Sequence, residues 1–255
     1  MADGIFETTE LDPVVCPDHG EYRPSVIRIA HREITTGCSA CADERRRAEE
    51  IEQREQARIE FQQRALGGAG VPRRFEGADF GTYSPPTERA EHVLTACTEY
   101  AARWDDVSQS GRSLALCGHP GTGKTHLAIS ILKTVIRSGG SGIYTTAIDL
   151  CRAIKSTWGR EAEESEAAAI ARYARTGLLV LDEIGVQFGS DTERLMIFDV
   201  IDQRYRQMLP TILVSNLTLV QMTDVLGERV IDRMRENSGM VLAFGWGSHR
   251  GSAAA

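Results

Sequence analysis

The sequence predicts an α/β fold: a three-layer sandwich around a five-stranded parallel sheet, preceded by a smaller N-terminal region. Five short apolar runs recur between residues 113 and 244, helical patterns separate them, and a glycine-rich loop follows the first run. Continuous apolar runs are typical of parallel strands buried on both faces, and crossover helices then cover the two faces of the sheet. The chain of 255 residues is long enough for one such core and an appendage.

The N-terminal region contains two pairs of residues with the spacing of metal ligands. Cys16 and His19 lie in "CPDHG", and Cys38 and Cys41 lie in "CSAC", with 18 residues between the pairs. Two such pairs suit a tetrahedral Zn²⁺ ion, which would supply much of the folding free energy of so short a region. We therefore expect a zinc-binding module; the alternative is four unrelated residues. His31 is a substitute ligand outside both pairs.

The composition of the chain indicates its domain boundaries. Residues 42–66 are helix formers with interleaved charges and almost no apolar face, which indicates an exposed helix. "GGAGVP" at 67–72 breaks this pattern, as glycine and proline clusters do at linkers. We predict a zinc-binding module at 1–41, a charged helix and linker at 42–72, and one α/β domain at 73–255.

Apolar patterns place the elements of the α/β domain. The strands are expected at 113–117, 142–146, 178–182, 211–215 and 240–244. Apolar residues recur at helical spacing from Leu127 to Ile136, after the first strand, and "SGG" ends that helix. Cys97, Cys117 and Cys151 fall in apolar segments and are expected to be core residues.

The glycine-rich loop matches the phosphate-binding pattern G-x-x-x-x-G-K-[ST]. Its glycines let backbone N–H groups turn toward phosphates, and the N-terminus of the next helix adds partial positive charge. We expect Lys124 to reach the terminal phosphates and the Thr125 hydroxyl to bind Mg²⁺. A chance glycine-rich turn is the alternative. The predicted nucleotide-binding residues are Gly118, His119, Pro120, Gly121, Thr122, Gly123, Lys124, Thr125 and His126.

Two acidic residues stand at the C-terminal edge of the third predicted strand. Asp182 and Glu183 come directly after the four apolar residues of "LLVLDEIG", at the sheet edge where ligands bind. We expect Asp182 to hold Mg²⁺ through water, and Glu183 to orient or deprotonate the water that attacks the γ-phosphate. A glutamate that acts on water indicates NTP hydrolysis and disfavours a metabolic kinase. Asn216, after the next strand, is a candidate γ-phosphate sensor; the alternative is a turn residue.

These motifs, with "LGERVIDRMRENS" and "FGWGSHR", resemble the DnaC/DnaI-type AAA+ proteins over about residues 65–250. This family contains bacterial and phage replicative helicase loaders, and the transposition ATPase IstB is a close relative. The resemblance implies an ATPase that forms a homo-oligomer in its ATP state. By position, Arg233 is the first candidate for the arginine finger and Arg229 the second; exposed surface arginines are the alternative. Arg250 resembles the sensor-2 arginine, which binds nucleotide in the same subunit.

The resemblance also implies a path for single-stranded DNA along "IDLCRAIKSTWGR", residues 148–160. Lys155 would pair with a phosphate there, and Trp158 would stack on a base. The alternative is a core tryptophan and a solvated lysine. The net charge of −7 argues against nucleic-acid binding through bulk positive charge, but it leaves such a local contact open.

The leading hypothesis is an ATP-dependent helicase loader. Its N-terminal region would bind a replicative hexameric helicase, although this region equally suits DNA, and ATP hydrolysis would time release. An IstB-like transposition ATPase that stimulates a transposase is the first alternative; a metabolic kinase and a zinc adaptor are the others. The expected cofactors are ATP, Mg²⁺ and Zn²⁺. Because the sequence shows no membrane span and no signal peptide, we expect a cytoplasmic protein.

Overall fold

The computed structural model describes residues 7–29, 32–185 and 190–249. The chain forms two compact units, Met1–Phe61 and Gln62–Ala255, and the division falls within the long helix α1 (Ser39–Gly68). Among the described residues, no helix is both long enough and apolar enough to cross a membrane.

The first unit contains two small antiparallel sheets and the N-terminal part of α1. β1 (Glu7–Glu10), β4 (Ser25–Ile29) and β5 (Arg32–Thr35) form one sheet, and β2 (Val14–Cys16) pairs with β3 (Gly20–Tyr22) to form the other. Every residue of α1 from 44 to 61 is exposed, in agreement with its interleaved charges.

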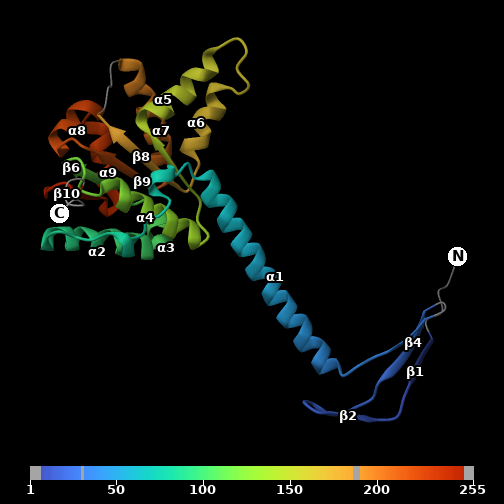
Figure 1. Cartoon of the computed structure of the whole chain (residues 1–255). Coiled ribbons are helices and arrows are strands. Elements are labelled where there is room, and N and C mark those ends of the chain that lie inside the picture. The colour runs from blue at the N-terminus through green and yellow to red at the C-terminus, as the bar shows by residue number, and fades with distance from the viewer. Residues whose placement is uncertain (1–6, 30–31, 186–189, 250–255) are drawn as a thin grey trace. The chain divides into compact units, whose positions relative to one another are not determined.

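The second unit is built on the predicted five-stranded parallel sheet (Figure 1). Its strands lie in the order β10-β6-β9-β8-β7. Alternate residues face opposite layers: Leu114 and Leu116 belong to one core cluster, and Ala115 and Cys117 belong to the other. The fold-class prediction is therefore confirmed. The strands are β6 (Leu114–Gly118), β7 (Gly142–Thr146), β8 (Leu178–Ile184), β9 (Thr211–Ser215) and β10 (Met240–Phe244).

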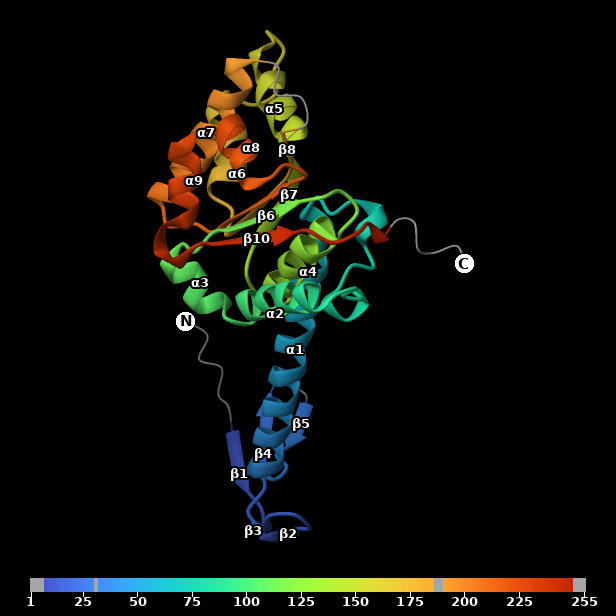
Figure 2. The same cartoon turned by 90° about the vertical axis from the view of Figure 1, so that its left-hand side faces the viewer.

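Helices cover both faces of this sheet, as Figure 2 shows. One face packs against α2 (Glu88–Ala102), α3 (Trp104–Ser110) and α4 (Lys124–Arg137). The other face packs against α5 (Ala147–Lys155), α6 (Glu166–Ala174), α7 (Asp191–Arg206), α8 (Leu219–Leu226) and α9 (Glu228–Arg235). Four 3₁₀ turns complete the described part of the unit: η1 (Arg73–Phe75), η2 (Phe80–Thr82), η3 (Ser156–Trp158) and η4 (Glu236–Ser238).

The end of α1 differs from the sequence-based prediction, whereas three cysteines lie where they were expected. The linker predicted from residue 67 begins two residues later, because Gly67 and Gly68 form the end of α1. Ala65 and Leu66 pack against the core of the second unit, and this packing outweighs the low helix propensity of the glycines. Cys97, Cys117 and Cys151 are buried, as expected for core residues.

Candidate functional site

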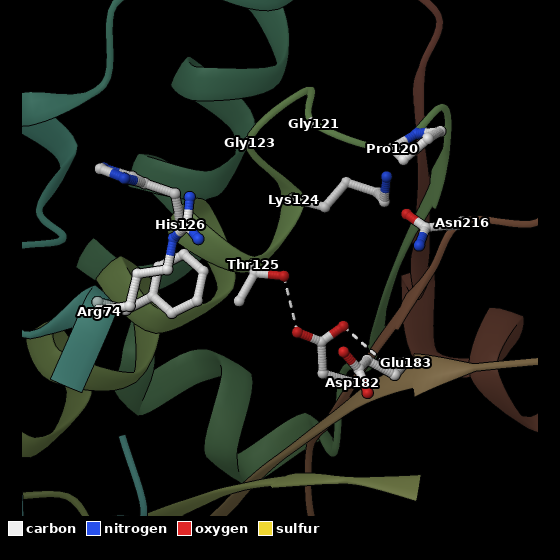
Figure 3. A pocket seen from close by; sticks show the side chains of 11 residues that line it. Arg74, Pro120, Gly121, Gly123, Lys124, Thr125, His126, Asp182, Glu183 and Asn216 are labelled. Atoms are coloured by element: carbon white, nitrogen blue, oxygen red, sulfur yellow. Dashed lines mark hydrogen bonds between the residues drawn. The ribbon is translucent and has the colours of Figure 1, made fainter. Parts of the chain in front are cut away.

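A pocket lies where the phosphate loop meets the carboxyl ends of β8 and β9 (Figure 3). Most of its lining residues were predicted from the loop and from the strand ends, but two come from η1 and were not. The lining residues are Arg74, Phe75, Pro120, Gly121, Gly123, Lys124, Thr125, His126, Asp182, Glu183 and Asn216.

Glycine and two aromatic side chains fix the conformation of the phosphate loop. Gly123 has a φ of +95°, and a Cβ atom there would lie 2.4 Å from the ring of Tyr83. The Tyr83 hydroxyl and the Trp246 indole N–H each donate to the carbonyl oxygen of Thr122, at 3.1 Å. Burial raises the pKa of Tyr83 to about 12, so its hydroxyl remains a donor at neutral pH. Sequence reasoning missed both aromatic residues.

Lys124 is buried at the wall of the pocket. Its Nζ donates to the carbonyl oxygens of Gly118 at 2.8 Å and His119 at 2.6 Å. Gly118, His119 and Thr122 therefore contribute to the loop through backbone oxygens and do not line the pocket themselves. The lysine charge lies where the loop pattern predicts that phosphates bind.

Thr125 and Asp182 form the part of the pocket that suits a metal ion. The Thr125 hydroxyl donates to Asp182 Oδ2 at 2.7 Å, and the Tyr144 hydroxyl donates to the same oxygen at 3.0 Å. Burial, together with the nearby Asp182 charge, raises the pKa of Tyr144 above its usual value, so Tyr144 remains a neutral donor. A hydroxyl and a buried carboxylate at this spacing fit the oxygen ligands that Mg²⁺ prefers.

Glu183 occupies a strained backbone position beside Asp182. Its φ is +59°, and the pairing of β8 with β9 shifts register between Leu181 and Ile184. The Glu183 amide donates to Asp182 Oδ1 at 2.6 Å. A left-handed backbone in a residue other than glycine is uncommon, and such strain clusters at functional sites. The bulge brings the Glu183 carboxylate to the same pocket as Asn216.

The two candidate arginine fingers have different environments on α9. Arg233 Nη2 lies 2.5 Å from the buried Asp202 Oδ1, and its guanidinium lies over the rings of Phe198 and Tyr205, 5.1 and 5.0 Å from their centroids. Arg229 is exposed and has no ion pair with any described residue. Neither arginine lines the pocket of its own chain.

Two further candidates lie outside the described residues. These are Arg250, expected to bind nucleotide, and His31, the substitute zinc ligand.

The predicted DNA-contacting residues lie away from the nucleotide pocket. Lys155 Nζ is 2.6 Å from Glu193 Oε1, so its charge is paired within the chain. Trp158 is 53% exposed, which contradicts the alternative of a core tryptophan, and its indole N–H donates to Glu166 at 2.7 Å. The adjoining residues 161–164 include three glutamates, so the surroundings of Trp158 are acidic.

The four predicted zinc ligands lie together in the first unit. The candidate ligand atoms of Cys16, His19, Cys38 and Cys41 all lie within 4.8 Å of one another. Cys41 Sγ is 3.5 Å from Cys16 Sγ and 3.3 Å from His19 Nδ1. Zinc–ligand bonds of about 2.0–2.3 Å in a tetrahedron place ligands about 3.3–3.8 Å apart, so these distances fit zinc. The other imidazole nitrogen, Nε2, donates to Glu44 at 3.1 Å.

Hydrogen bonds adjust the ionisation of this cluster. The backbone amide of Asp18 and the side chain of His19 lower the pKa of Cys16 to about 6. The bond to Cys16, followed by the bond to Glu44, raises the pKa of His19 to about 9. A thiolate at Cys16 is the form that binds a metal ion.

Comparisons with known proteins place this site in context. Residues 48–241 match the family model described as "IstB-like ATP binding protein". The chain is 35% identical over 188 residues to "Replicative helicase loader DnaC" of Buchnera aphidicola subsp. Baizongia pistaciae, a match that covers 74% of this chain and 75% of that protein. DnaC of Escherichia coli K12 is 33% identical with the same coverage. A crystal structure of the DnaC helicase loader superposes with a TM-score of 0.61 at 25% identity, and the match covers 68% of this chain and 99% of that one.

Proposed function

Because this chain belongs to the family of IstB-like ATP binding proteins, which includes DnaC, we propose that it is an ATP-dependent loader of a replicative hexameric helicase. One observation carries the proposal: Thr125, Asp182 and Glu183 meet beside the phosphate loop, in a chain whose similar curated proteins are named replicative helicase loaders. Those names do not favour the alternative of a transposition ATPase.

ATP hydrolysis would proceed in the pocket at the edge of the sheet. Lys124 would neutralise the terminal phosphates. Thr125 and Asp182 would hold Mg²⁺, which would shield the negative charge of the same phosphates. Glu183 would position and deprotonate the attacking water, and Asn216 would contact the γ-phosphate. Arg250 would add a cation from the same chain. The position of Lys124, Thr125, Asp182, Glu183 and Asn216 along one pocket supports their assignment.

A neighbouring copy would complete each ATP site with Arg233 or, as the second choice, Arg229. Arg233 would have to leave Asp202 to reach a neighbouring γ-phosphate, whereas Arg229 is already exposed. Mixing two inactive variants tests this arrangement. The Lys124→Ala chain should not bind nucleotide but still carries both arginines. When it is mixed with Arg233→Ala or Arg229→Ala, it should supply the missing arginine to the intact ATP site of that variant and restore phosphate release. If neither Arg233→Ala nor Arg229→Ala is rescued in this way, hydrolysis does not depend on a finger from a neighbour.

The N-terminal region would bind the helicase. Cys16, His19, Cys38 and Cys41 would hold Zn²⁺ and fold the module at 1–41, and the helix and linker at 42–72 would join it to the ATPase domain at 73–255. The ligand distances and the exposed, charged surface of α1 support this division of roles.

The ATPase domain would bind single-stranded DNA through Trp158 and Lys155. The exposed indole of Trp158 offers a face on which a base can stack. Lys155 would have to exchange Glu193 for a phosphate, so the acidic surroundings would make this contact weak and sensitive to salt.

A helicase-loading experiment tests the proposed function. The purified chain, ATP and a replicative helicase are added to a DNA fork coated with single-strand binding protein, and unwinding is followed with time. We expect the chain to accelerate unwinding, Lys124→Ala to abolish this effect, and Glu183→Gln to bind the helicase without releasing it. An unchanged unwinding rate with no binding to the helicase would refute the loader proposal, and stimulation of a transposase would restore the alternative.

A further inference from the structure

Arg74 and Phe75 line the nucleotide pocket, although neither belongs to a recognised phosphate-binding motif. Both residues lie in η1, about 45 residues before the phosphate loop. The Arg74 side chain is exposed, and it has no hydrogen bond or ion pair with any residue that the structure describes. A cation that faces a phosphate-binding pocket without a protein partner is available to a bound anion.

The segment that carries Arg74 is anchored to α4. Nζ of the buried Lys133 donates to the carbonyl oxygens of Glu76 and Ala78, each at 2.8 Å. Nε2 of His126 donates to the Asp79 carbonyl oxygen at 2.8 Å. Because α4 begins at Lys124 of the phosphate loop, these bonds set the position of η1 relative to that loop.

The order of residues along the pocket indicates which part of a nucleotide Arg74 would meet. In Figure 3, Asp182, Glu183 and Asn216 lie at one end, Thr125 lies between, and Arg74 and His126 lie at the other end. A γ-phosphate belongs at the end with the water-activating carboxylate, so the α-phosphate and the nucleoside belong at the end with Arg74.

We infer that Arg74 is a nucleotide-contacting residue that pairs with the α-phosphate, and that Phe75 packs beside the nucleoside. A guanidinium donates two parallel hydrogen bonds to phosphate oxygens, and a lysine cannot reproduce that geometry. The inference rests on the proposed nucleotide site and adds a contact from the segment that directly follows the linker.

Calorimetric titration with ADP and with a non-hydrolysable ATP analogue, both with Mg²⁺, tests the inference on the full chain. Arg74→Ala should weaken the binding of both nucleotides by the same factor, about 10- to 100-fold, because both contain the α-phosphate. Arg74→Lys should recover only part of the loss. Arg73→Ala is the matched control, since Arg73 is an exposed arginine in the same turn that does not line the pocket, and its affinity should stay within about twofold of the unmodified chain.

The outcomes separate the inference from the function on which it rests. Unchanged affinity in Arg74→Ala, or a loss confined to the ATP analogue, would overturn the α-phosphate contact. Failure of the unmodified chain to bind either nucleotide would overturn the proposed function instead. Fluorescence of the buried Trp104 and Trp246 monitors folding of the variants, and the exposed Arg74 side chain should leave it unchanged.

Discussion

Glu183 combines a proposed catalytic carboxylate with a strained backbone, and glycine at this position would separate the two properties. A left-handed conformation costs a non-glycine residue about 1–2 kcal/mol. The φ of Glu183 is +59°, so Glu183→Gly relieves this strain. The greater freedom of glycine in the unfolded chain offsets about 0.5–1 kcal/mol of the gain. We therefore expect the variant to be more stable by about 0.5–1 kcal/mol, a rise in Tm of roughly 1–4 °C.

The same variant should lose ATP hydrolysis. Removing a positioned general base lowers the rate by about 10²- to 10⁴-fold, which corresponds to about 3–5 kcal/mol of transition-state stabilisation. Glu183→Gln should lose turnover to a similar extent but gain no stability, because glutamine keeps the side chain and the backbone strain. The opposite signs of the effects on stability and activity are the specific expectation.

Two measurements check this reasoning. Thermal unfolding of the nucleotide-free chain, followed through the buried Trp104 and Trp246, gives the change in Tm. Release of inorganic phosphate from added ATP gives the turnover rate. A Glu183→Gly variant that is less stable than the unmodified chain would show that the positive φ does not store strain. Turnover within tenfold of the unmodified chain in both variants would show that another group activates the water.

Three further predictions concern other parts of the molecule. Glu44→Gln should weaken zinc binding by about 10- to 100-fold in competition with a chromophoric chelator, because Glu44 bonds to the candidate ligand His19. Glu49→Gln should leave zinc binding unchanged, because Glu49 has no bond to a candidate ligand among the described residues. Arg204→Met should lower the free energy of unfolding in urea by about 3–5 kcal/mol, because the fully buried guanidinium bonds a hydroxyl and four carbonyl oxygens; a loss below 1 kcal/mol contradicts this. In anisotropy titrations with labelled oligothymidine at fixed salt, Trp158→Ala should weaken binding about 10-fold and Glu193→Gln should strengthen it; no change in either variant would exclude DNA contact by this segment.

The sheet and the phosphate loop were predictable because their signals are local. The central strands β6, β8 and β9 are buried over almost their whole length, so their sequences are mostly apolar and stand out in a short window. The predicted runs at 142–146, 211–215 and 240–244 coincide with β7, β9 and β10. The loop residues follow one another in sequence, so their pattern could be recognised without any knowledge of tertiary contacts.

The remaining features depend on contacts between distant residues. Tyr83 and Trp246 support the same carbonyl oxygen of Thr122, but they lie 39 and 124 residues from it in sequence. The partner of Arg233 is Asp202, on a different helix, so the sequence could not distinguish a paired arginine from an exposed one. The positive φ of Glu183 arises from a register shift between β8 and β9, and nothing in "LLVLDEIG" indicates it.

The support of the phosphate loop explains how it can be rigid and still bind an anion. Tyr83 and Trp246 donate to the Thr122 carbonyl oxygen, and the amide of His249 donates to the Gly121 carbonyl oxygen at 2.9 Å. Each of these bonds uses an acceptor of the loop. The amides of Gly121, Thr122 and Gly123 have no acceptor among the described residues, so they stay available to phosphate oxygens. Since the scaffold uses acceptors and a phosphate uses donors, the two do not compete, and the loop holds its shape before nucleotide arrives.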